Sequence, residues 1–260
     1  MSIWEDLTTL DLLALDPAHA VAILPVAAVE QHGPHLPLGT DAIIGDAILD
    51  AALGSLDPSL PVFRLPGQCI GHSPEHAAFP GTLSLRAETL IALWTDIGRS
   101  VAAAGFRKLV LFNSHGGQGA LVDVVAQRLR SEAAMLVVRC SYYRFALPEA
   151  WITERERRFG LHGGQVETSL MLHIAPHLVR RDRCADVRSR AEDWQAAEPD
   201  LEVEGETGIA WCAQDLDPSG VVGDAPAASA ALGARLLAHY AQRLAKVIAA
   251  LQRAPFLPPD

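Results

Sequence analysis

Hydrophobic and polar positions along the chain follow two alternating patterns. Short, almost continuous apolar runs such as AVAILPVAAVE predict buried strands, because a strand covered on both faces has no polar side. Longer Ala- and Leu-rich segments, whose apolar residues recur every three or four positions, predict helices between them. The expected strands are 20–30, 60–66, 106–114 and 134–143, and the expected helices are 41–53, 86–105, 120–133, 164–175 and 225–252. This order is typical of an α/β fold with a mostly parallel central sheet, here in a single domain spanning 1–260.

One long stretch, 181–224, departs from this pattern. It is rich in charge and connects two expected helices without a clear period of its own. Connections of this length are usually functional, so we expect an active-site loop or lid. The alternative is a solvated excursion without a covering role.

Composition narrows the class of protein. The chain has 260 residues, half of them hydrophobic, and a formal net charge of −10 with no long basic run, which argues against nucleic acid as a partner. The four cysteines, Cys69, Cys140, Cys184 and Cys212, form no C-x-x-C pair, so neither a zinc knuckle nor a disulfide framework is expected. The N-terminus lacks the positive region of a signal peptide, and no apolar run approaches the roughly 20 residues that span a bilayer. We therefore expect a cytoplasmic protein with no membrane partner.

Strong metal ligands are concentrated in EQHGPHLPLGTD, residues 30–41. In an extended segment alternate side chains share a face, so Glu30 and His32 can point at one ion while Gln31 points away. An isolated E-x-H pair is more often structural than ligating. Asp41 changes this balance, because a carboxylate at the start of the next helix can bridge two cations, although it could also be the N-cap of that helix.

A second cluster, NSHGGQ (113–118), follows an expected buried strand. Ligands in open α/β sheets gather at the carboxyl ends of strands, which places His115 where a metal or substrate would be. Gly116 and Gly117 allow a bound group to approach the backbone closely, so we expect them to contact substrate. The cluster lacks the Lys-Ser/Thr of a P-loop and the third glycine of a dinucleotide fingerprint, which argues against a nucleotide-binding oxidoreductase.

A third cluster is HGGQVETSLMLH (162–173). Glu167 lies in an otherwise apolar helix, where a carboxylate is costly unless it is paired or bound to a metal. We therefore expect Glu167 to be a fifth ligand with a part in catalysis. His162 lies just before that helix and is a candidate acid or base, since its ordinary pKa of about 6.5 suits proton transfer at neutral pH.

A fourth cluster, GHSPEHAAFPGTLSL (71–85), contains Ser73, Glu75 and His76 beside a Pro-Gly turn. This density of polar groups suggests a loop that contacts substrate. A helix start with Ser73 as its cap and Glu75 in its first turn is an equally good interpretation.

Taken together, EQHGPHLPLGTD, EHAAFPGTLSL, NSHGGQ, HGGQVETSLML and GVVGDAPAAS resemble, in this order, the motifs of the creatininase (creatinine amidohydrolase) family over roughly residues 20–250. The resemblance implies a three-layer α/β/α domain, a two-metal site at the carboxyl ends of the strands, hydrolysis of a cyclic or linear amide, and a homohexamer.

The resemblance also implies roles for single residues. Glu30, His32, Asp41 and His115 match metal ligands of the family, with Asp41 as the bridge. His162 matches a histidine that serves the chemistry.

One position departs from the pattern of creatininase itself. Creatininase has a metal-binding Glu two residues after the histidine that His115 matches, where this chain has Gly117. Glu167 resembles the replacement found in H-G-G members of the family. Those members include a formamidopyrimidine-type deformylase and the peptidase of a peptide-cofactor pathway, so creatinine is not the expected substrate.

The sequence therefore predicts a metal-dependent amidohydrolase that acts on carbon–nitrogen bonds other than peptide bonds in a small, cyclic or formamide substrate. Water activated between two divalent ions would attack the carbonyl, and His162 would protonate the departing nitrogen. Zinc is the expected metal, with manganese or iron(II) as alternatives, because mixed oxygen and nitrogen ligands suit all three. The alternatives are a peptidase acting on a short peptide, and a catalytically silent metal- or ligand-binding protein on the same scaffold.

Overall fold

The computed structural model describes residues 2–17 and 19–255 and is built around a parallel five-stranded sheet. In sheet order the strands are β1 (Ser2–Ile3), β3 (Val62–Arg64), β2 (Val21–Val26), β4 (Lys108–Asn113) and β5 (Leu136–Ser141). The central strands β2 and β4 pair in parallel from Val21 beside Lys108 to Val26 beside Asn113. The carboxyl ends of β2 and β4 therefore lie side by side, and the segments that follow the two strands start next to each other.

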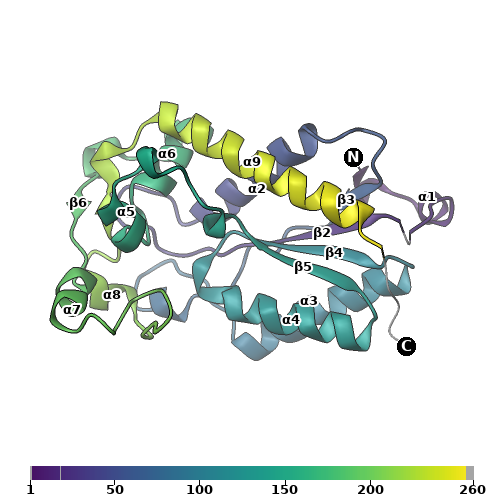
Figure 1. The fold of residues 1–260 in the computed structure, drawn as a ribbon, viewed down its shortest axis with the longest axis horizontal. Helices are drawn as coiled ribbons and strands as arrows, with labels where there is room; N and C mark the ends of the chain where they lie inside the picture. Colours follow the sequence, from purple (N-terminus) through teal and green to yellow (C-terminus); the bar gives the residue numbers. More distant parts are fainter. Residues whose placement is uncertain (1, 18, 256–260) are drawn as a thin grey trace.

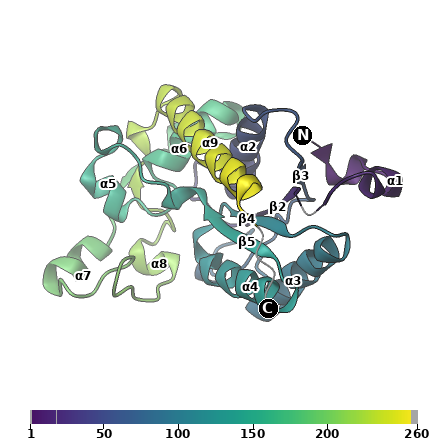
Figure 2. The ribbon, with the colours of Figure 1, turned by 45° about the vertical axis from the view of Figure 1, so that its right-hand side comes forward.

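Helices cover both faces of this sheet, as Figures 1 and 2 show. One face carries α2 (Thr40–Gly54), α6 (Gln165–Ile174) and α9 (Ala230–Arg253), and the other carries α3 (Ala87–Ala103) and α4 (Gly119–Glu132). The three-layer α/β/α architecture and the parallel sheet confirm the predicted fold class.

Two hydrophobic cores lie on opposite sides of the sheet, and β4 contributes to both. Val110 and Phe112 pack into the core under α2, α6 and α9, whereas Leu109 and Leu111 pack into the core over α3 and α4. Side chains alternate between the faces of a strand, so a strand buried on both sides must be apolar at every position. This requirement explains the continuous apolar run in the sequence.

All nine predicted elements are present, with shifted ends. The expected helix 225–252 begins five residues later, because the Ser229 side chain caps α9 by accepting a hydrogen bond from the Leu232 N–H. The expected strand 20–30 ends at Val26. Asp41 is not an N-cap: α2 begins at Thr40, and Asp41 lies within its first turn.

Short elements that the pattern did not predict complete the fold. The helices are α1 (Thr9–Leu13), α5 (Glu154–Phe159), α7 (Ala191–Ala197) and α8 (Ala213–Leu216), and β6 (Asp186–Val187) pairs with β7 (Gly223–Asp224) in an antiparallel ribbon. The 3₁₀ helices are η1 (Trp4–Asp6), η2 (Pro74–His76), η3 (Gly116–Gln118), η4 (Tyr142–Arg144), η5 (Glu149–Trp151), η6 (Pro176–Leu178), η7 (Arg181–Arg183) and η8 (Ala225–Ala227). The stretch 181–224 thus has regular structure of its own, and α5, α7 and α8 lie toward the end of the molecule opposite α1 (Figure 1).

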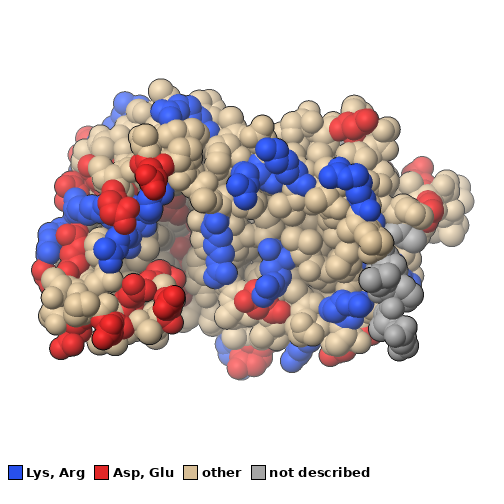
Figure 3. All heavy atoms as spheres, viewed as in Figure 1, with Lys and Arg blue, Asp and Glu red and all other residues tan. Residues whose placement is uncertain are grey.

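Charged side chains are unevenly distributed over the visible face of the molecule. On the face seen in Figure 3, Lys and Arg side chains are scattered over the middle of the molecule, while Asp and Glu are denser at the end that carries α7 and α8. Among the described residues, no helix is long and apolar enough to cross a membrane.

Candidate metal centre

The five expected ligands converge at the carboxyl edge of the sheet. Glu30 and His32 follow β2, and His115 follows β4, so the parallel pairing of these strands brings them together. Asp41 and Glu167 come from the first turns of α2 and α6. Glu30, His32, Asp41 and His115 are at most 3% exposed.

These side chains form two groups that share Asp41. One consists of Glu30, Asp41 and His115, and the other of His32, Asp41 and Glu167; within each group, ligand atoms lie within 4.8 Å of one another. In the first, His115 Nδ1 is 3.2 Å from Glu30 Oε1 and 3.3 Å from Asp41 Oδ2. In the second, His32 Nε2 is 3.4 Å from Asp41 Oδ1 and 4.0 Å from Glu167 Oε1. The two carboxylate oxygens of Asp41 therefore face different groups.

Backbone carbonyls determine which nitrogen each histidine offers. His32 Nδ1 lies 3.1 Å from the carbonyl oxygen of Glu30, and His115 Nε2 lies 3.0 Å from that of His72. A carbonyl only accepts, so these nitrogens carry the protons of the neutral rings. The lone pairs of His32 Nε2 and His115 Nδ1 then point at the carboxylates, as in histidines that bind metals.

Three buried polar atoms of the centre have no hydrogen-bond partner: Glu30 Oε2, His32 Nε2 and Asp41 Oδ2. Buried polar atoms are almost always satisfied, so three orphans within one cluster of ligand-type residues indicate a site for a bound group. Carboxylate oxygens and imidazole nitrogens are ligands of divalent transition metals, and the donor set fits such ions.

The electrostatics of the centre also favour a cation. Burial alone would lower the pKa of His32, but Asp41, Glu167 and Glu30 raise it to about 9. The pKa of His115 is raised well above its ordinary value, since Glu30 and Asp41 outweigh its burial. Burial would raise the pKa of Asp41, yet His32 and His115 hold it below its usual range. The buried carboxylates thus favour positive charge at this centre.

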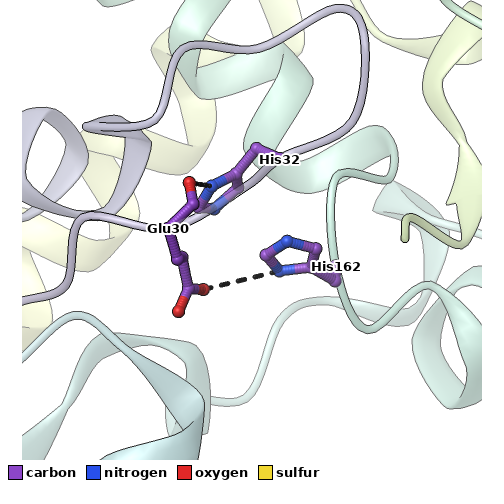
Figure 4. A group of neighbouring side chains, drawn as sticks. All are labelled: Glu30, His32 and His162. Atoms are coloured by element: carbon purple, nitrogen blue, oxygen red, sulfur yellow. Dashed lines mark hydrogen bonds and ion pairs between the residues drawn. The ribbon is translucent and has the colours of Figure 1, made fainter. Parts of the chain in front are cut away.

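His162 lies beside this centre (Figure 4). Its Nε2 donates to the carbonyl oxygen of Gln31 at 2.6 Å, and its Nδ1 is 3.8 Å from Glu30 Oε1. Its ring is 4.2 Å, centroid to centroid, from the rings of both His32 and His76. Burial first, and then the positive charge of His32, lower the pKa of His162. A neutral His162 therefore presents an unprotonated Nδ1 to the centre and must accept a proton before it can donate one.

The loop expected to contact substrate lies against His115. Ser73 Oγ and Glu75 Oε1 are both 3.3 Å from His115 Nε2. Ser73 is at the N-cap position of η2 and Glu75 is in its first turn, as the alternative interpretation expected, although the Ser73 side chain makes no capping hydrogen bond. His76 Nε2 is 3.5 Å from Glu30 Oε1, and burial, followed by the charges of neighbouring histidines, lowers the pKa of His76 to about 2. Substrate contacts by these residues stay a prediction.

Gly117 and Gly116, also expected to contact substrate, have different surroundings. A Cβ on Gly117 would overlap the carboxylate of Glu75, whereas a Cβ on Gly116 would meet no atom within 4 Å. The space beside Gly117 is therefore filled by Glu75, from another part of the chain. Glu167 lies instead with His32 and Asp41.

Sequence reasoning missed residues that hold the centre in place. Asn113 clamps the backbone of His115, since its Oδ1 accepts from the His115 N–H at 3.1 Å and its Nδ2 donates to the His115 carbonyl at 2.8 Å. His35 Nε2 donates to the Gly163 carbonyl at 2.9 Å, next to His162. Asn113 belongs to NSHGGQ and His35 to EQHGPHLPLGTD, so the quoted motifs contained both residues without revealing their hydrogen bonds.

Comparison with known proteins identifies the family. The model of the family described as "Creatininase: Creatinine amidohydrolase" matches residues 5–248. The chain is 33% identical over 231 residues to the mycofactocin precursor peptide peptidase of Mycobacterium tuberculosis (strain ATCC 25618 / H37Rv), covering 83% of this chain and 79% of the relative. It is 33% identical over 182 residues to the creatinine amidohydrolase of Pseudomonas putida, covering 64% and 68%.

Solved structures agree. A crystal structure of creatininase has a TM-score of 0.77 at 26% identity and covers 97% of this chain and 98% of that one. A manganese form of creatininase and a Zn–Zn form of a creatininase variant have TM-scores of 0.75 and 0.78, both at 27% identity, covering 97% of this chain and 99% and 98% of theirs. The chain belongs to the creatininase family of metal-dependent hydrolases that act on carbon–nitrogen bonds.

Proposed function

We propose that the chain hydrolyses an amide bond of a small substrate with two divalent ions. Glu30 and His115 would hold one ion, His32 and Glu167 the other, and Asp41 would bridge them. The observation that carries this proposal is the pair of groups sharing Asp41, with the lone pairs of both histidines turned toward it. When bound, the ions would polarise the substrate carbonyl and lower the pKa of a water molecule.

Mixed oxygen and nitrogen ligands are compatible with zinc, manganese and iron(II). Zinc is proposed, with manganese as the second choice, and the similarity to creatininase structures containing these metals supports both. A homohexamer, which the family resemblance implies, is part of the proposal; light scattering coupled to size-exclusion chromatography would test it.

His162 is proposed to carry the proton between water and leaving group. Its Nε2 is held by the Gln31 carbonyl, so proton exchange with substrate occurs at Nδ1, which faces Glu30. The lowered pKa leaves Nδ1 free to take a proton from the attacking water and then pass it to the departing nitrogen. This path refines the donor role expected from sequence.

A short peptide is the second candidate substrate. The similarity to mycofactocin precursor peptide peptidases extends over 83–84% of the chain, against 64% for the creatinine amidohydrolase of Pseudomonas putida. Glu75 fills the space beside Gly117, the position at which the chain departs from creatininase, which argues against creatinine. Cyclic amides, formamides and short peptides therefore form the substrate panel.

The first experiment is elemental analysis of protein purified without chelator, followed by assays of this panel with zinc or manganese restored. Two ions per chain and hydrolysis of at least one amide class are expected. One ion at saturation would contradict the shared carboxylate. Full metal occupancy with no turnover across the panel would favour the silent binding protein.

A further inference from the structure

Gln31 lies between the two ligands that follow β2, and its side chain is 5% exposed. Its Oε1 accepts from the Gly33 N–H at 2.9 Å, and its Nε2 donates to the carbonyl oxygen of Gly220 at 2.6 Å. A flipped amide would place N–H against N–H and oxygen against oxygen. The two backbone groups therefore fix which end of the amide is the donor.

The second hydrogen of this amide points at His76. Gln31 Nε2 lies 2.8 Å from His76 Nδ1, and an amide nitrogen can only donate, so Nδ1 must be the unprotonated nitrogen. In the neutral ring the proton then resides on Nε2, which lies 3.5 Å from Glu30 Oε1. His76 therefore presents an N–H to the centre.

The backbone of Gln31 imposes the opposite state on His162. Its carbonyl accepts the Nε2–H of His162, so His162 presents the lone pair of Nδ1 toward the same Glu30 oxygen at 3.8 Å. The rings of His76 and His162 are stacked, with an interplanar angle of 28°. One residue thus contacts both stacked imidazoles, through its side chain and its main chain.

We propose that Gln31 is a positioning residue that holds His76 and His162 in opposite tautomers, a hydrogen-bond donor beside an acceptor. His76 is then not a metal ligand, although His76, Glu75 and Glu30 are close enough to form a third group. Its Nε2–H is available to a carboxylate or to a substrate oxygen, next to the nitrogen that accepts the proton. The role of these two tautomers in catalysis rests on the proposed function, whereas the assignment of the tautomers themselves does not depend on it.

Gly220 completes this arrangement from the far end of the stretch 181–224. Its φ of +79° is in the left-handed region, and a Cβ there would lie 2.7 Å from Gln31 Oε1 and from Phe79 Cζ. A side chain at this position would displace the carbonyl that orients the amide. The stretch 181–224, expected to be a loop or lid, therefore supplies the backbone carbonyl that orients the Gln31 amide.

The test combines variants with a direct measurement of tautomers. Gln31→Glu replaces the amide donor with an acceptor of the same shape, Gln31→Met removes the hydrogen bonds, and Gln127→Glu adds the same charge on the exposed side of α4 as a control. ¹⁵N NMR of the imidazoles is recorded on Zn²⁺-loaded protein without substrate, with His76 assigned by His76→Phe. Zinc affinity and kcat are measured in parallel.

The native protein and the control should show His76 protonated at Nε2 alone. Gln31→Glu should move the proton to Nδ1, and Gln31→Met should give a mixture. Zinc affinity should stay within about threefold, because the tautomers of the ligands are fixed by backbone carbonyls, while kcat falls by about 10–100-fold, as is typical when an orienting partner is lost.

A native His76 protonated at Nδ1, or a zinc-coordinated Nε2, would overturn the proposal, as would an unchanged tautomer in Gln31→Glu. The native spectrum decides even if a variant fails to fold. Because the spectra need no substrate, a protein with the expected tautomers but no hydrolysis would count against the proposed function and not against the role of Gln31.

Discussion

The two helical layers of the molecule differ in the acidic residues that they place near the carboxyl ends of the strands. Helices α2 and α6 place Asp41 and Glu167 in their first turns, and both carboxylates face the metal centre. On the other face, α3 has only the exposed Glu88 in its first turn, and α4 has no acidic residue there. The layers are equivalent as covers of a hydrophobic sheet but not as sources of ligands.

This difference shows how the scaffold separates stability from chemistry. A helix that follows a parallel strand starts at the carboxyl edge of the sheet, where its N-terminal dipole favours a carboxylate. Among the described α-helices, only those of the α2 and α6 layer use this position for acids that face the metal centre. Substitutions in the two layers should therefore affect different properties.

The largest effect is expected from Asp41→Ala. Removing the bridge leaves both groups one ligand short, so the loss in affinity for each ion should exceed the roughly 10–100-fold that an outer-shell substitution costs, and activity should vanish. Metal content and isothermal titration would measure this. Asp50→Ala, on the exposed side of the same helix, is the matched control and should bind both ions normally. Loss of one ion alone would contradict a bridging Asp41.

His162→Ala should keep both ions and lower kcat by roughly 10²–10⁴-fold, the contribution of acid–base catalysis. A substrate with a good leaving group needs little protonation and should lose less. Rates on an activated and an ordinary amide would be compared with metal content, with the exposed His177→Ala as control. Depleted metal would make His162 a ligand, and equal losses on both substrates would remove it from proton transfer.

In the other layer, Trp94→Ala on α3 should reduce the free energy of unfolding by about 3–5 kcal/mol, because it empties a fully buried site. Metal affinity should be unchanged. Trp94→Phe should be far milder, since the indole N–H has no hydrogen-bond partner to lose. Chemical denaturation and metal titration of both variants would show whether the layers are independent. A weakened metal affinity in folded Trp94→Ala would mean that they are coupled.

Much of the fold could be predicted because the pattern of apolar residues within a helix or strand is a local property of the sequence. The run containing Leu109, Val110 and Leu111 identifies β4 without knowledge of its neighbours. Short elements such as α7 and α8 were missed, because their few buried residues pack in a small separate cluster that includes Ala191 and Leu216 and leave too short a pattern to recognise.

The candidate site was predicted in part for the same reason. Motifs reveal residue types at strand ends, and the structure brings all five expected ligands together there. Whether they bind metal stays a prediction. Contacts between distant segments leave no local pattern: Glu75 beside Gly117, and Gln31 bonded to Gly220, are visible only when the chain is folded.

A smaller effect is expected from pH. The pKa of His32 is raised from its ordinary 6.5 to about 9, so below pH 9 its proton stabilises the metal-free fold and must leave when an ion binds. Apparent metal affinity should therefore rise with pH between about pH 7 and 9, by at most about tenfold per unit for each proton released. Calorimetry in buffers of different ionisation enthalpy would count the protons. A flat affinity with no proton release would contradict a protonated His32.

The smallest effect is expected at Gly117, in the 3₁₀ helix η3 that leads into α4. A methyl group there would overlap Glu75, which ends in a flexible side chain and can rotate away from His115. Gly117→Ala should therefore lower metal affinity by about tenfold or less, the lower end of the loss seen when an outer partner of a ligand is removed. Gly116→Ala is the matched control, since the same methyl group would enter open space. Metal titration of the two variants, with Glu75→Gln beside them, separates the contact from any effect of the backbone.

If Gly117→Ala and Gly116→Ala bind metal equally well while Glu75→Gln binds poorly, the Glu75 carboxylate has kept its contact with His115, and the space beside Gly117 is not what positions it. If all three bind as the native protein does, Glu75 contributes nothing to metal affinity, and His115 is held by the His72 carbonyl, Ser73 and Asn113 instead.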